Sequence, residues 1–94
     1  SDIVSVFSLG FGDAEALELI VHGDSKTSKI VGKKISELNL PDTVNIGAVV
    51  RKNKVILANT DIKIESDDHM IIFLLDKKDI SKVEKMFQVE VGFF

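Results

Sequence analysis

Hydrophobic and polar residues alternate along the first part of the chain, and this alternation predicts β-strands. Residues 3–9 are rich in β-branched and aromatic types and predict a first strand, and a turn follows it. In residues 16–21 the side chains of Leu17, Leu19 and Val21 share one face, which indicates a half-buried strand. A helix is the alternative there, because Ala, Leu and Glu all favour helices.

The alternation returns in the middle of the chain and predicts a hairpin with strands at 44–51 and 54–58. Lys52 and Asn53 are its two-residue turn, since asparagine tolerates the left-handed backbone that such turns need. Residues 69–75 are almost wholly apolar, which predicts a central strand covered on both faces. In the first hairpin strand, the residues expected to share a face are Val44, Ile46, Ala48 and Val50.

Two segments have helical spacing. Residues 32–38 predict a short helix that ends before Pro41, since Val31, Ile35 and Leu38 recur at intervals of four and three. Residues 76–88 predict a longer one with Asp76 as N-cap, and its apolar face is formed by Ile80, Val83 and Phe87. The predicted fold class is therefore α+β, with a mixed or antiparallel sheet of about five strands covered by two helices.

The composition restricts the class of protein. The 94 residues form one domain, 1–94, and the absence of an initial Met suggests a fragment of a longer protein. Without cysteine there is no disulfide, thiolate zinc site or cysteine nucleophile. The net charge of −3 argues against nucleic acid as a partner, and no apolar run approaches the ~20 residues that span a bilayer.

No set of residues indicates an enzyme or a metal site. His22 and His69 lack metal-ligand spacing, and no serine lies in a Gly-x-Ser-x-Gly motif. Gly10-Phe11-Gly12 and Gly32-Lys33 only partly match nucleotide-binding motifs. The acidic group Asp61, Glu65, Asp67 and Asp68 lacks the order of a calcium loop, so a solvated turn is favoured.

Two features indicate interaction with other molecules. Lysines at 26, 29, 33 and 34 surround a predicted helix start, where a phosphate-bearing ligand could bind, although a soluble loop explains them as well. Three of the six aromatic residues, Phe87, Phe93 and Phe94, lie close together at the chain end. Apolar aromatics there suggest that the end packs on the sheet or contacts a second copy, so we expect a homodimer or a higher ring.

Several motifs together resemble the RCK C-terminal (TrkA-C) domain family. They are residues 28–41 (SKIVGKKISELNLP), residues 46–51 (IGAVVR) with Val55-Ile56-Leu57, and residues 68–73 (DHMIIF). The family pattern places a glycine before this Asp-His pair, where Asp67 stands here. The resemblance extends over nearly the whole chain, through Val83-Glu84-Lys85-Met86-Phe87-Gln88 to Phe93-Phe94.

This resemblance implies a regulatory domain in the cytoplasmic subunit of a potassium uptake system. Such a subunit lies at the inner face of the cell membrane and gates a membrane channel subunit, without inserting into the membrane itself. NAD, NADH or ATP would bind to N-terminal RCK domains absent from this chain, and this domain would need no cofactor. In related regulators the C-domains pair and sometimes bind cyclic di-AMP in the cleft between them. By position, the ligand-binding residues would be Ile30, Val31, Lys33, Asn45, Ile46 and Arg51.

Two alternatives stay open. The lysine-rich loop and Arg51 are also compatible with a stand-alone sensor of a nucleotide or cyclic dinucleotide. An amino-acid-binding module of the ACT type is similarly small and α+β, but it would have a ferredoxin-like βαββαβ arrangement.

Overall fold

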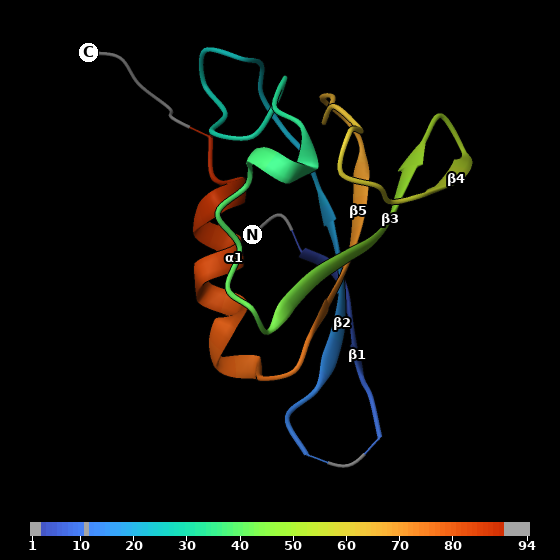
Figure 1. The fold of residues 1–94 in the computed structure, drawn as a ribbon, viewed down its shortest axis with the longest axis vertical. Helices are drawn as coiled ribbons and strands as arrows, with labels where there is room; N and C mark the ends of the chain where they lie inside the picture. Colours follow the sequence, from blue (N-terminus) through green and yellow to red (C-terminus); the bar gives the residue numbers. More distant parts are fainter. Residues whose placement is uncertain (1–2, 11, 90–94) are drawn as a thin grey trace.

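A computed structural model describes residues 3–10 and 12–89 and contains one five-stranded sheet (Figure 1). The strands are β1 (Ile3–Ser8), β2 (Glu15–Ile20), β3 (Val44–Arg51), β4 (Lys54–Leu57) and β5 (His69–Leu74). Their order in the sheet is β1-β2-β5-β3-β4, and every neighbouring pair is antiparallel. The predicted α+β class and five-stranded sheet are confirmed, and residues 16–21 belong to a strand rather than a helix.

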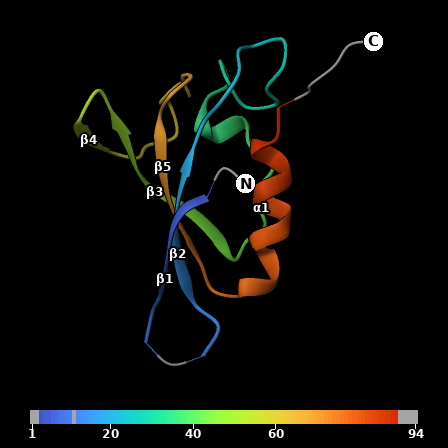
Figure 2. The ribbon, with the colours of Figure 1, turned by 180° about the vertical axis from the view of Figure 1, so that it is seen from behind.

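In the described part of the chain one α-helix, α1 (Ile80–Phe87), packs on one face of this sheet (Figure 2). Val83 and Phe87 of α1 are buried against the side chains of the three central strands. The inner row from β2 through β5 to β3 consists of Leu17, Ile72 and Ile46, and the next row of Leu19, Met70 and Val49. These residues form one hydrophobic core between the sheet and the helix, since all of them are buried.

The hairpin turn has the predicted geometry. Lys52 and Asn53 both have positive φ, 51° and 66°, which is the backbone of a type I′ turn. This turn matches the twist of β3 and β4, and the two strands pair from Arg51 with Lys54 to Ala48 with Leu57.

The prediction of which β3 side chains face the core is wrong for the second half of the strand. A β-bulge at Gly47 shifts the register between Ile46 and Ala48, so Val49 instead of Ala48 and Val50 points into the core. The ring of Phe73 lies where a side chain at position 47 would be, because a Cβ there would be 2.9 Å from Cδ2 of Phe73. Gly47 therefore permits both the bulge and the close approach of the ring.

The strand β5 is central, as predicted, but the described residues cover only one of its faces. Met70, Ile72 and Leu74 are buried beneath α1, whereas Phe73 on the opposite face is 42% exposed. Within residues 3–10 and 12–89 the expectation of a doubly covered strand is therefore wrong. The sheet has an inner face under α1 and an outer face that no described element covers (Figures 1 and 2).

The two predicted helices differ in outcome. Between residues 32 and 38 there is only the 3-10 turn η1 (Ile35–Glu37), because the N–H groups of Gly32, Ile35 and Ser36 donate to carbonyl groups of residues 60–64 and not along a helix. The second helix begins with the 3-10 turn η2 (Lys77–Asp79), continues as α1 and is capped as expected, since the Asp76 side chain accepts from the Lys78 N–H. With β1 and β2 joined directly as a hairpin, the element order is not βαββαβ, which excludes the ACT-type alternative.

No helix among the described residues is both long and apolar enough to cross a membrane.

Candidate functional site

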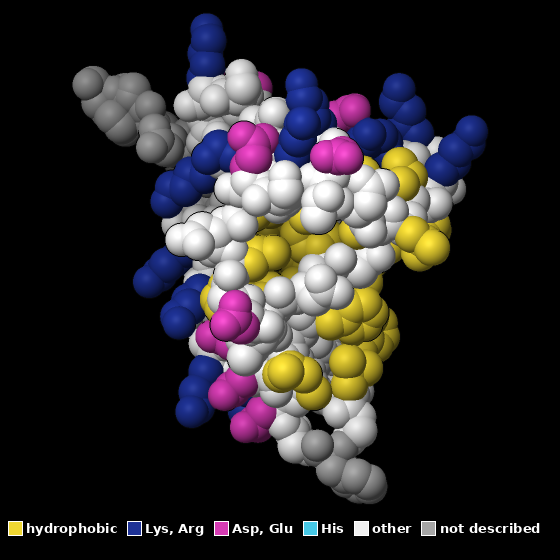
Figure 3. Space-filling view, viewed as in Figure 1, with side chains coloured by type: hydrophobic (Ala, Val, Ile, Leu, Met, Phe, Trp, Pro, Cys, Tyr) yellow, Lys and Arg dark blue, Asp and Glu magenta, His cyan; other side chains and the backbone are white. Residues whose placement is uncertain are grey.

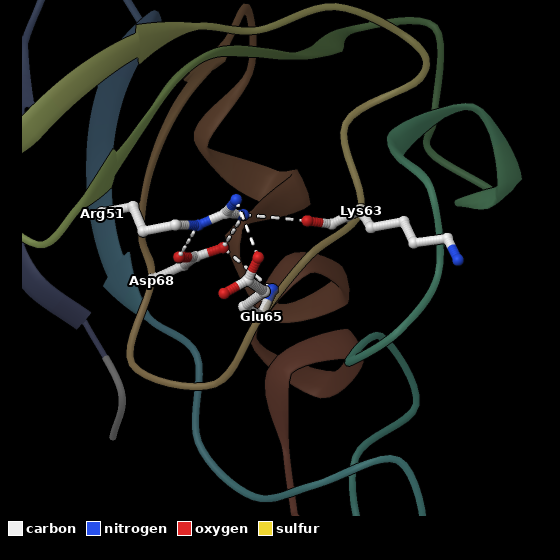
Figure 4. Close-up of polar contacts among 4 residues, drawn as sticks. All are labelled: Arg51, Lys63, Glu65 and Asp68. Carbon is white, nitrogen blue, oxygen red and sulfur yellow. Dashed lines mark hydrogen bonds and ion pairs between the residues drawn. The ribbon is translucent and has the colours of Figure 1, made fainter.

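A buried ion pair joins the start of β5 to the end of β3 (Figure 4). Asp68 is 1% exposed, and both of its carboxylate oxygens are used. Oδ1 accepts from Arg51 Nε at 2.8 Å, while Oδ2 accepts from a terminal nitrogen of Arg51 at 2.8 Å and from the Glu65 N–H at 2.9 Å. This bidentate geometry is the strong form of a carboxylate–guanidinium contact.

The guanidinium of Arg51 also holds the loop before β5. It donates to the Lys63 carbonyl oxygen at 2.8 Å and pairs with a carboxylate oxygen of Glu65 at 2.9 Å. The hydrogen bonds with Asp68 raise the pKa of Arg51 above its already high ordinary value, so the guanidinium stays charged. Arg51 is thus a structural anchor whose donors are largely occupied.

The loop that Arg51 holds forms a short ladder with the lysine-rich segment. The Gly32 N–H donates to the Ile64 carbonyl at 2.8 Å, and the Ile64 N–H donates to the Lys33 carbonyl at 2.9 Å. Residues 32–34 are therefore hydrogen-bonded to Ile64, which lies between the two loop residues that contact Arg51.

The loop of residues 24–31, which precedes this segment, is held by several local hydrogen bonds. The Asp24 side chain accepts from the backbone N–H groups of Lys26 and Thr27 at 2.9 and 3.0 Å, and the Asp24 N–H donates back to Thr27 Oγ1. These bonds lower the pKa of Asp24, chiefly through the Lys26 N–H. Next, the buried Ser28 accepts from the N–H groups of Ile30 and Val31, both at 3.1 Å, and Ser28 forms an isolated bridge with Val89.

The predicted ligand-binding residues fall into two groups. Ile30, Val31, Lys33 and Arg51 lie on the 63–65 loop or on the segment bonded to it, and of these four Lys33 is the exposed cation. Ile46 is buried in the core. Asn45 is exposed near the other end of β3, about 20 Å from Arg51 at the usual rise per residue, so one chain does not bring it to the first group.

The predicted dimer contacts divide as well. Phe87 is only 2% exposed, and its ring packs inside its own chain. Phe93 and Phe94 lie outside the described residues.

The sequence pattern did not identify Asp68 as the buried partner of Arg51. Its acidic neighbours suggested a solvated turn, but Asp68 alone turns inward while Asp61, Glu65 and Asp67 stay exposed. A carboxylate directly before an apolar strand, with an arginine ending the neighbouring strand, is the signal that could have identified the pair. Among residues 3–10 and 12–89, no three His, Cys, Asp or Glu side chains gather as metal ligands.

We expect Asp68→Asn to cost about 3–5 kcal/mol of folding free energy, because it leaves the largely buried Arg51 charge without its carboxylate. Glu65→Gln is the matched control and should cost under about 1 kcal/mol, since that carboxylate is over half exposed. Urea denaturation of both variants measures the difference. Equal losses for the two would contradict a dominant role of Asp68.

Asp67 has φ of 71°, the left-handed backbone for which the family pattern uses glycine. The turn is kept because aspartate is among the residues that tolerate this conformation. We expect Asp67→Gly to stabilise the chain by about 0.5 kcal/mol, the relief of strain being partly offset by the freer unfolded chain. Asp67→Val should destabilise it by about 1 kcal/mol or more. Thermal or urea denaturation in which glycine ranks below valine would refute the strained turn.

Comparison with known proteins gives a consistent result. A profile of the TrkA-C domain family matches residues 25–88. The chain is 50% identical over 93 residues to the Trk system potassium uptake protein TrkA of Halomonas elongata, covering 99% of this chain and 20% of that protein. It is 49% identical over 88 residues to TrkA of Vibrio alginolyticus, covering 94% of this chain and 19% of that protein. The chain thus spans about a fifth of the length of these relatives.

Solved structures agree with the fold. The RCK_C domain dimer of S. agalactiae BusR in complex with c-di-AMP superposes with a TM-score of 0.63 at 29% identity, over 77% of this chain and 93% of that chain. An RCK domain described with cda has a TM-score of 0.57 at 13% identity, over 82% and 100% of the two chains, and supports the fold alone. The predicted resemblance is confirmed: this chain belongs to the TrkA-C domain family.

Proposed function

We propose that this chain is a regulatory domain of a cytoplasmic subunit that gates a potassium uptake system. The single observation that carries the proposal is the 50% identity to TrkA of Halomonas elongata over 99% of the chain. In this proposal the domain has no catalytic role and no cofactor of its own. NAD, NADH or ATP would bind to RCK domains elsewhere in a longer protein.

The proposal includes self-association. Two copies would pair as a homodimer, or within a higher ring, and the longer protein would contact a membrane potassium channel subunit from the cytoplasmic side. A solved relative at 29% identity is described as an RCK_C domain dimer, which supports pairing. Neither nucleic acid nor direct membrane insertion has a part in this function.

The contacts of Arg51 suggest how such a domain transmits a signal. Residues 32–34 are hydrogen-bonded to the loop that Arg51 holds, and Arg51 is in turn fixed to Asp68 at the start of the central strand. A partner or ligand that moves this segment would therefore act on the sheet as a whole and not on a loose loop. Coupling of this kind needs an element with two arrangements, and the ladder between residues 32–34 and 63–64 is our candidate.

A replacement experiment tests the potassium function. The matched fifth of Halomonas elongata TrkA would be exchanged for this chain in cells that lack TrkA, and growth on limiting potassium would be measured. We expect growth to be restored well above that of the protein truncated before this region. A chimera that is expressed equally but grows no better than the truncated protein would contradict the proposal.

A second candidate function is the sensing of a cyclic dinucleotide. The observation that favours it is the bound c-di-AMP of the BusR domain, together with the exposed Lys33 beside the rigid 24–31 loop. In this proposal the ligand lies in the cleft of a pair, since Asn45 is distant from Lys33 within one chain and a second copy would have to contribute one of the two.

Thermal denaturation with c-di-AMP tests this candidate. We expect the ligand to raise the melting temperature by mass action. Lys33→Ala should weaken binding at least tenfold, whereas Lys54→Ala, which removes an exposed lysine at the start of β4, should not. An unchanged melting temperature at ligand concentrations far above micromolar would exclude it without affecting the potassium function.

A further inference from the structure

Two lysines lie directly opposite each other where the lysine-rich segment meets the loop before β5. Lys34 and Lys63 form an isolated antiparallel bridge. The flanking residues, not the two lysines, make the hydrogen bonds on either side of it, at 3.0 and 2.9 Å: Ile35 N–H to Ile62 carbonyl, and Ile64 N–H to Lys33 carbonyl. The two lysines are therefore a non-hydrogen-bonded pair, the position at which opposite side chains of an antiparallel ladder lie closest, with Cβ atoms about 4.5–5.5 Å apart.

This like-charge pair is unfavourable in the chain by itself. Like charges placed directly opposite each other across a ladder destabilise it. Both side chains are exposed, and within residues 3–10 and 12–89 no carboxylate forms an ion pair with either ammonium group. The fold thus holds two positive charges together without supplying the negative charge that would balance them.

The acidic side chains of the same two segments do not neutralise the pair. Glu37 accepts from the backbone N–H of Lys34 at 2.7 Å, and Glu65 pairs with Arg51. Asp61 is exposed on the loop and, in the described part of the chain, forms no ion pair with either lysine. The two ammonium groups therefore remain available to an anion from solution.

The backbone beneath the pair is fixed by hydrogen bonds. The Lys63 carbonyl accepts from Arg51 at 2.8 Å, and the Lys63 side chain points away from that contact (Figure 4). Lys34 has an extended backbone, with φ of −76° and ψ of 153°, so its side chain and that of Lys33 leave the segment on opposite sides. Figure 3 shows lysine and arginine side chains gathered at this end of the molecule. An anion would bind here with little ordering of the backbone, which favours affinity.

We propose that Lys34 and Lys63 of a single chain form a binding site for a phosphoryl group. A phosphate dianion between the two ammonium groups replaces their mutual repulsion by two attractive contacts, and lysine binds phosphate well as a point charge. The bound anion then joins the lysine-rich segment to the loop that Arg51 holds, in addition to the backbone hydrogen bonds. The site differs from the cleft proposed for a cyclic dinucleotide, which needs Lys33 and a second copy. It also goes beyond the potassium function, so that either can fail without the other.

Amide NMR titration of the 94-residue chain with sodium phosphate, against sodium chloride at equal ionic strength, measures the binding. We expect saturable shifts of the N–H signals of Lys34 and Ile64 with phosphate. Lys34→Gln and Lys63→Gln should each raise the dissociation constant by about fivefold or more, because one of two contacting charges is lost. Lys33→Gln is the matched control, since it removes a neighbouring exposed lysine on the other side of the segment, and it should change the constant by less than about twofold.

Thermal denaturation in chloride tests the repulsion itself. We expect Lys34→Gln and Lys63→Gln each to raise the melting temperature by about 2–4 °C, because either substitution removes the like-charge contact. The double variant should gain no more than the better single variant, since the contact can be removed only once. Added phosphate should raise the melting temperature of the unaltered chain and of Lys33→Gln by mass action, and that of the other variants much less.

Three results would overturn the inference. If Lys34→Gln and Lys63→Gln both lower the melting temperature in chloride, the two side chains do not repel each other. If these two variants and Lys33→Gln bind phosphate equally, the anion responds to the general charge of this end and not to the pair. If phosphate well above millimolar concentration shifts no signal, the pair holds no phosphoryl group.

A phosphoryl group can belong to a soluble molecule or to a lipid headgroup, and co-sedimentation with phosphatidylglycerol vesicles separates the two. Retention on the vesicles that Lys34→Gln abolishes and Lys33→Gln leaves intact assigns the site to a headgroup. A chain that responds to phosphate in solution but is not retained on the vesicles assigns it to a soluble phosphorylated ligand.

Discussion

One helix cannot cover a sheet that is apolar on both faces, and much of this structure follows from that constraint. The inner face and α1 form a core in which the central strand residues are almost completely buried. The outer face is nearly as apolar but lies open in the described part of the chain. A domain of this length has little stability in reserve, so a second covering layer would add burial that the chain alone cannot provide.

The Arg51–Asp68 pair has a complementary role at one end of the sheet. It fixes the 59–68 loop, whose carbonyl groups then accept from the N–H groups of Gly32, Ile35 and Ser36. Buried ion pairs seldom contribute much net stability, because desolvation offsets their attraction. Their value here is geometric: the pair determines where the loop, the lysine-rich segment and the start of β5 lie relative to each other.

The sequence predicted the strands well and the details that depend on distant residues poorly. Alternation located β3 and β4, an apolar run located β5, and the Lys52-Asn53 turn followed from local backbone preference. The bulge at Gly47 could not be predicted, since it accompanies the close approach of the Phe73 ring, 26 residues away in the sequence. The apolar spacing in 32–38 suggested a helix, but an extended segment anchored on residues 60–64 points the same side chains toward the core.

The candidate site shows the same limit. Family resemblance selected Arg51 as a ligand residue, but its burial and its bonds to Asp68, Glu65 and Lys63 depend on a fold that brings three separate segments together. The exposure of the outer face could not be predicted from the sequence either. An apolar central strand suggests that both faces are covered, but the sequence does not say which element covers the second.

Amide hydrogen exchange tests most directly the claim that the Arg51–Asp68 pair fixes the loop before β5 and, through it, the lysine-rich segment. In Asp68→Asn we predict that the Gly32 and Ile64 N–H groups, which join that segment to the loop, exchange much faster than in the unaltered chain. The Leu75 N–H, bonded to the Thr43 carbonyl at the other end of the sheet, should be accelerated less. Equal acceleration of all three N–H groups would contradict the account.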